Sequence, residues 1–214
     1  MRRSSILAAT VLAFSLGAWA QGSQPTQARR PPVQEPESEI SVQGAGFFTK
    51  NVNGTGTTYS ATQAVAALGT YRRHLKPQLS VEVAYGYARN TQKYQVASQG
   101  FRIQTNINQV TAAFVAHMTP RIHEKLKPYL LLGGGGLIFA PSGSQANYIS
   151  GAAHQTKGVF VYGGGVDYAI SKKFDFRLEY RGLIYGTPAF GFGSLITNAV
   201  THTAVPSIGI GYKF

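Results

Sequence analysis

The sequence has no cysteine, little charge and few acidic residues. Charged side chains make up 13% of its 214 residues, and only 8 residues are Asp or Glu. Without cysteine the chain has no disulfide framework and no thiolate metal site. Its longest apolar run, residues 6–20, is shorter than the roughly 20 residues that a transmembrane helix needs. These absences exclude a bundle of transmembrane helices and argue against an ordinary soluble domain, in which charge is about twice as frequent.

Glycine, aromatic residues and basic charge are abundant instead. The chain contains 25 glycines, 12 tyrosines and 12 phenylalanines, and its 20 lysines and arginines give a net charge of +12. Its mean hydropathy is close to zero. This combination fits a β-sheet that shows one face to lipid and the other to polar groups.

The N-terminus predicts export. Arg2 and Arg3 precede the apolar run, which ends in the small-x-small sequence Ala18-Trp19-Ala20. Residues 1–20 are therefore expected to be a signal peptide cleaved after Ala20. The arginine pair also permits twin-arginine export of a folded protein, but its context, RRSSIL, matches that signal poorly, which favours the general pathway.

Two further segments follow the predicted signal peptide. Residues 21–38 are rich in Pro, Gln and Ser and have no apolar period, so we expect a flexible periplasmic tail. Residues 39–214 are expected to form an outer-membrane β-barrel.

Strict alternation of apolar and polar residues predicts strands over residues 79–87, 174–184 and 204–214. Weaker alternation predicts five more strands, over residues 40–48, 63–72, 110–118, 129–139 and 159–168. Residues 101–107 have the opposite phase to 110–118, which indicates a bulge or a strand projecting above the membrane. Short connections alternate with long ones, of which 90–100 is one, as in barrels with short periplasmic turns and long outer loops.

The last predicted strand resembles a known signal. Its alternate apolar positions end on a terminal aromatic residue, like the assembly signal of bacterial outer-membrane barrels. The residues are Ile208, Ile210, Tyr212 and Phe214. The segments LSVEVAYGY (79–87), KPYLLLGGGG (127–136) and FRLEYRG (176–182) are similar to strands of the small OmpA-like and OmpX-like barrels.

The resemblance implies an all-β fold, namely an eight-stranded antiparallel up-and-down transmembrane β-barrel in the cell outer membrane of a Gram-negative-type cell. It also implies insertion by the barrel-assembly machinery. The peptidoglycan-binding domain of full-length OmpA-type proteins is not expected here. A soluble lipocalin-like barrel is the alternative fold, but its outward faces would need more charge than this chain has.

The alternation also predicts charges inside the barrel. Glu82 lies on the third predicted strand, and Arg177, Glu179 and Arg181 lie on the seventh. Third and seventh strands face each other in a ring of eight, so we expect a cross-barrel ion cluster in which the two glutamates accept from the two arginines. The expected role is structural, since an eight-stranded barrel is filled by its side chains. A gated ion path is the alternative.

The placement of charge predicts partners. No acidic residue lies in the long connections, which carry Lys50, Arg89, Lys93, Arg102 and Lys157. We expect this basic outer rim to face anionic lipopolysaccharide. A second basic group is expected to meet phospholipid head groups at the periplasmic rim: Arg72, Arg73, Lys76, Arg121, Lys125, Lys127, Lys172 and Lys173. Nucleic-acid binding is not expected, because the chain has no basic helix and no stacking platform.

Two glycine runs, residues 133–136 and 163–165, lie inside predicted strands and lack the GK[ST] sequence of a phosphate loop. We expect them to pair across neighbouring strands, Gly136 with Gly163, in a curved part of the wall.

Catalysis lacks a complete set of residues. The candidates at the outer rim are His154, His202, Ser142, Ser144 and Ser150, and no carboxylate accompanies them. No catalytic, metal or cofactor site is predicted. The expected function is a structural or surface-interaction role in the cell envelope, with an unknown surface ligand. A narrow solute or ion channel and a lipid A-modifying enzyme are the alternatives.

Overall fold

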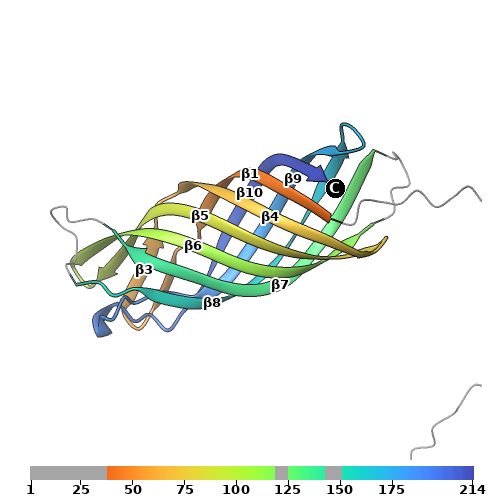
Figure 1. Cartoon of the computed structure of the whole chain (residues 1–214). Helices are drawn as coiled ribbons and strands as arrows, with labels where there is room; N and C mark the ends of the chain where they lie inside the picture. The colour runs from red at the N-terminus through yellow and green to blue at the C-terminus, as the bar shows by residue number, and fades with distance from the viewer. Residues whose placement is uncertain (1–37, 119–124, 143–150) are drawn as a thin grey trace, which may run out of the picture. The chain divides into compact units, whose positions relative to one another are not determined.

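The computed structural model describes residues 38–118, 125–142 and 151–214. The predicted signal peptide and all but the last residue of the predicted tail lie outside this part. Within it, ten strands form one antiparallel sheet, and eight of them close into a barrel (Figure 1). The barrel strands are β1 (Ser38–Thr49), β4 (Ala64–Lys76), β5 (Leu79–Val96), β6 (Gln99–His117), β7 (Leu126–Pro141), β8 (Gln155–Ala169), β9 (Phe174–Gly186) and β10 (Val200–Lys213).

The barrel closes between its first and last strands. The β1–β10 pairing runs from Glu39 opposite Lys213 to Thr49 opposite Thr203. The amide of Phe214 donates to the carbonyl of Ser38 at 2.9 Å. We call the end of the barrel that holds these two residues the periplasmic end, following the expected topology, and the opposite end the outer end. Among the described residues, no helix is long and apolar enough to cross a membrane.

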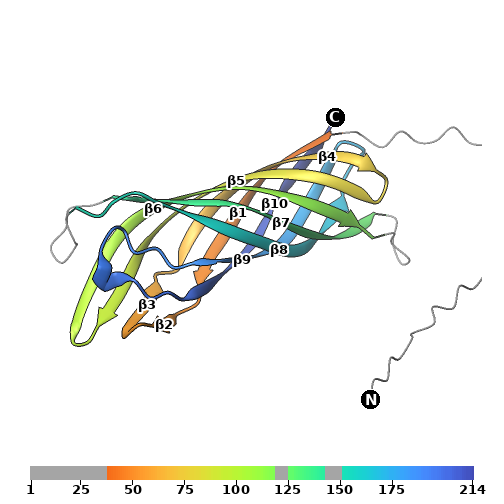
Figure 2. The same ribbon diagram turned by 90° about the horizontal axis from the view of Figure 1, so that it is seen from below.

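Two short elements extend the outer end. β2 (Val52–Gly54) and β3 (Thr57–Ala61) form a hairpin, and β3 pairs with the outer part of β5 (Figure 2). A 3₁₀ turn, η1 (Gly193–Leu195), lies in the connection between β9 and β10.

The predicted fold class and all eight predicted strands are confirmed, but one connection was wrong. Residues 90–96 and 99–100 are strand rather than loop, and residues 97–98 form the turn between them, because β5 and β6 pair without interruption up to Val96 opposite Gln99. The same register excludes a bulge at the phase change in β6. Ile103 and Ile107 face inward there, because above the membrane the outer face meets water and the apolar side chains turn to the core.

The expected orientation of the membrane-facing residues is also confirmed. Val83 and Leu178 are 49% and 57% exposed, whereas their neighbours Glu82 and Arg177 are buried. The exposed residues form the surface that lipid covers in an outer-membrane barrel. Not every aromatic residue near a strand end belongs to that surface. Tyr129, Phe139 and Tyr185 point inward and are buried.

The glycine pairing was predicted in the wrong register. Gly136 pairs with Gly158, and Gly163 pairs with Leu131. The glycines are nevertheless required where they lie, because a Cβ on Gly133 would approach the carbonyl oxygen of Ala112 to 2.0 Å. The neighbouring strand β6 therefore approaches the β7 backbone too closely for a side chain at this position. Such a close approach agrees with a curved part of the wall.

Candidate functional site

The barrel lumen brings the four predicted charged residues together. The Arg181 guanidinium donates to Glu82 Oε1 through Nη2 and to Glu179 Oε1 through Nε, both at 2.5 Å. Arg177 Nη1 lies 3.8 Å from Glu82 Oε2, so the third and seventh barrel strands meet across the lumen. All four residues are at most 2% exposed.

Four further charged residues, which the sequence analysis did not place in the lumen, complete this group. Arg72 donates to Glu82 Oε2 at 2.8 Å and to Asp167 Oδ2 at 3.0 Å. Arg177 binds Asp167 through both Nε and Nη2, and it also donates to Glu39. We call the group the ion cluster; its members are Glu39, Arg72, Glu82, Asp167, Asp175, Arg177, Glu179 and Arg181.

Arg72 corrects a prediction, because it was expected at the periplasmic rim among lipid head groups. The parity of its strand was ambiguous in the sequence, since Ala66 and Ala67 are both apolar and either could face in. The adjacent Tyr71 indicates which way Arg72 faces. Its ring is 40% exposed on the lipid side, so the next residue must face the lumen.

Tyr129 contacts three members of the ion cluster. Its hydroxyl donates to Glu179 Oε2 at 2.6 Å. The guanidinium carbon of Arg72 lies 4.3 Å from the centre of the ring, and that of Arg177 lies 5.5 Å from it. The ring therefore contributes cation–π contacts between two arginines of like charge.

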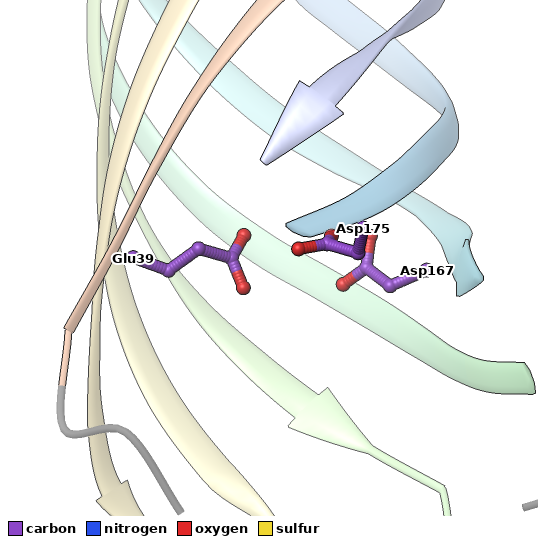
Figure 3. Close-up of side chains that lie close together, drawn as sticks. All are labelled: Glu39, Asp167 and Asp175. Atoms are coloured by element: carbon purple, nitrogen blue, oxygen red, sulfur yellow. The ribbon is translucent and has the colours of Figure 1, made fainter. Parts of the chain in front are cut away.

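Three carboxylates near the periplasmic end could in principle hold a metal ion. Oxygens of Glu39, Asp167 and Asp175 lie within 4.8 Å of one another, and Figure 3 shows the side chains pointing toward a common point. Arg177 Nη2 already supplies a positive charge at that point. It donates to Glu39, donates to Asp167 Oδ2 at 2.9 Å and lies 3.9 Å from Asp175 Oδ2. We therefore assign the three carboxylates to the ion cluster rather than to a metal site.

Asp175 accepts fewer hydrogen bonds than the other acids of the cluster. Neither of its oxygens accepts a hydrogen bond from the described residues, although the side chain is fully buried. The Lys213 ammonium lies 3.3 Å from Oδ1 and supplies the nearest positive charge. Five carboxylates thus face three guanidinium groups and one ammonium group.

The outer half of the lumen is filled differently, by apolar and aromatic side chains. The connection between β9 and β10 folds into the barrel mouth, and Phe190 and Leu195 are each 1% exposed. The ring of Phe190 packs edge-on against Tyr94 and Phe139, with centroids 6.4 and 6.3 Å apart. We call this group the outer plug; it consists of Tyr59, Tyr94, Phe139, Phe190 and Leu195.

Polar contacts hold the outer plug in place. The Tyr94 hydroxyl donates to the carbonyl of Pro188 at 2.6 Å. Gln155 Oε1 accepts from the amides of Ala189 at 2.6 Å and Phe190 at 3.0 Å. Burial raises the pKa of the Tyr94 phenol above its ordinary value, so the hydroxyl remains a donor at neutral pH. Phe190 has a φ of +52°, a conformation that costs about 1–2 kcal/mol outside glycine and that burial of the ring offsets.

The candidate catalytic residues do not form a site in the described part of the chain. His202 Nε2 lies 3.1 Å from the hydroxyl of Tyr162, and His154 is exposed. Ser142 is described, whereas Ser144 and Ser150 lie outside the described residues. Each described carboxylate belongs to the ion cluster, so none accompanies these histidines.

Known proteins agree with this geometry. The outer membrane protein beta-barrel domain family matches residues 6–214. This chain belongs to that family. It is therefore an integral outer-membrane β-barrel protein, as the resemblance to OmpA-like barrels implied.

One curated relative and two solved structures illustrate the likeness. Outer membrane protein A of Klebsiella aerogenes is 25% identical over 169 residues, which are 79% of this chain and 44% of that relative. This chain thus spans less than half the length of that relative. OprG of Pseudomonas aeruginosa superposes with a TM-score of 0.61 at 16% identity, covering 84% of this chain and 96% of that one. Neisserial surface protein A gives a TM-score of 0.56 at 17% identity, covering 82% and 97%. Both structures support the fold.

Proposed function

We propose that this protein is a closed structural barrel that strengthens the outer membrane and presents its outer strands and connections for surface contact. The observation that carries the proposal is the filling of the lumen. An ion cluster occupies the periplasmic half and the outer plug occupies the other half, so the barrel offers a rigid wall rather than a path.

The ion cluster supports a structural role because it joins strands that are not neighbours. Arg181 on β9 donates to Glu82 on β5, and Arg72 on β4 donates to Asp167 on β8. Desolvating such charges costs several kcal/mol per ion, so the cluster stabilises the barrel only while its partners are all present. A side-chain network of this kind resists both opening of the lumen and shearing of the strands.

A narrow channel is the alternative function, and conductance decides between the two. The folded protein in a planar lipid bilayer is expected to show no stable single-channel steps in 1 M KCl. Reproducible steps whose size changes in Glu82→Gln or Arg181→Gln would refute the closed barrel and place the ion path through the cluster. Glu82 and Arg181 suit this test because both are buried at the centre of the lumen.

A lipid A-modifying enzyme is the second alternative. We propose that the protein is not an enzyme, which is supported by the lack of a carboxylate beside His154 and His202 in the described part of the chain. The mass of lipid A before and after deletion of the gene tests this, and a change in acylation on deletion would favour the enzyme.

We further propose the route and the lipid partners of the barrel. The route consists of a signal peptide cleaved after Ala20 and recognition of Ile208, Ile210, Tyr212 and Phe214 by the barrel-assembly machinery. Ile208 and Ile210 are more than half exposed to the lipid side, and the ring of Tyr212 stacks on Phe214 with centroids 6.1 Å apart. Outer-membrane lipid covers the exposed apolar band, and lipopolysaccharide is the expected neighbour of the basic outer rim.

A further inference from the structure

β3 and the outer ends of β5 and β6 run side by side (Figure 2). We call these three segments the outer extension, and a groove lies on its outward face. Two rows of residues cross these three strands on that face. One row is Ser60, Lys93 and Arg102, and the other is Thr58, Gln95 and Gly100. Gly100 has no side chain, so the second row leaves space beside the two cations.

The two cations of the groove are in an arrangement that a sheet normally avoids. Lys93 and Arg102 are directly opposite each other on adjacent strands, where like charges are destabilising. The sequence has no acidic residue from 83 to 123, and no salt bridge within the described residues reaches either cation. An anion bound between Lys93 and Arg102 would therefore relieve their repulsion.

The direction of the groove indicates where that anion comes from. Tyr85 and Tyr87 lie on the same face of β5, closer to the membrane, and their hydroxyls donate to Asn108 and Asn106. Lys93 is six residues beyond Tyr87 on β5, which is about 20 Å of strand. The groove thus opens sideways, directly above the lipid-facing surface, and not upward toward the medium.

We infer that this groove binds a phosphate group on the core oligosaccharide of lipopolysaccharide. The membrane-anchored glycolipid stands beside the barrel at this height, and its phosphates complement Lys93 and Arg102 while the Ser60 and Thr58 hydroxyls can donate to phosphate oxygens. The inference rests on the proposed function, which places the barrel in the outer membrane with lipopolysaccharide beside its basic outer rim, and it deepens that proposal by assigning the phosphate contact to Lys93 and Arg102.

Titration of the folded protein in detergent micelles with purified lipopolysaccharide tests the inference. The double variant K93Q/R102Q should bind about 30-fold more weakly than the parent, because each basic residue near an anionic surface contributes about a fivefold change. K172Q/K173Q makes the same charge change at the periplasmic turn and should bind like the parent. In detergent alone K93Q/R102Q should melt at the same temperature as the parent or higher, since the substitutions remove a repulsive pair.

Two ligand controls separate possible sources of the phosphate. Lipopolysaccharide from which the core phosphates have been removed should bind parent and K93Q/R102Q equally. Inorganic phosphate should compete only weakly. Equal binding of intact lipopolysaccharide by both proteins would overturn the inference, and so would binding of inorganic phosphate as tight as that of the glycolipid. Bilayer conductance of the same proteins tests the closed barrel separately, so the two proposals can fail independently.

Discussion

Replacing Glu82 by glutamine should destabilise the barrel by about 3 kcal/mol. The Glu82 carboxylate accepts from Arg72 at 2.8 and 3.0 Å and from Arg181 at 2.5 Å, and it is 1% exposed. Glutamine keeps the size and one acceptor oxygen but removes the negative charge. Breaking a buried pair by removing one partner costs about 3–5 kcal/mol, and we expect the lower end because both arginines retain a second acid.

The second acids are identified by the structure. Arg72 keeps Asp167, and Arg181 keeps Glu179. Arg181→Gln should cost a similar amount. The double variant E82Q/R181Q should cost at least about 1 kcal/mol less than the sum of the single variants, since residues in one ion-pair network are not independent. Exposed Lys125→Gln is the control and should change stability by at most about 1 kcal/mol.

The assay must avoid tryptophan fluorescence, because the only tryptophan is Trp19 in the predicted signal peptide. Urea unfolding in lipid vesicles, followed by far-UV circular dichroism and by the gel migration of unheated samples, measures the free energy instead. The reasoning is refuted if Glu82→Gln costs no more than Lys125→Gln, or if the two lumen substitutions are additive.

The remaining predictions concern the outer plug and the wall. Phe190→Ala should expose the connection between β9 and β10 to protease and leave the urea midpoint of the barrel nearly unchanged, because the ring packs in the outer plug and not in the membrane-spanning wall; an unchanged cleavage pattern would contradict this. Gly133→Ala should prevent folding, since the new Cβ would lie 2.0 Å from the Ala112 carbonyl oxygen, whereas Gly44→Ala, with no atom within 4 Å of its Cβ, should fold normally. Gel migration of unheated samples reads both outcomes, and equal folding of the two variants would contradict the steric argument.

The barrel was predictable because the membrane enforces one period on every strand that crosses it. Alternation placed Val83 and Leu178 outside and Glu82 and Arg177 inside, as the structure has them. Above the membrane that rule ends. The β5–β6 hairpin has polar residues on one face and Ile103 and Ile107 on the other. Its residues 101–107 were interpreted as a bulge or a strand above the membrane, whereas residues 90–96 were assigned to a connection.

The lumen was predictable only in part, for a geometric reason. Glu82 and Arg177 could be matched because they lie equally far from comparable turns on opposite strands. Asp167 and Glu39 depend on the stagger of the strands around the barrel, which no single strand reveals. The outer plug was not foreseen at all, because Phe190 and Leu195 lie in a connection without any period.

The few acidic residues that the structure describes share one location. The five described carboxylates lie in the lumen, within reach of Arg72, Arg177, Arg181 or Lys213. If lipopolysaccharide surrounds the outer end, as we propose, a carboxylate on the outward face there would repel its phosphates, whereas one in the lumen balances a buried guanidinium. In the described part of the chain the acids thus lie on the side of the wall where they stabilise the barrel, and the outer extension carries cations alone. The same division explains how a barrel with so few charged residues can have both a charged interior and a basic outer rim.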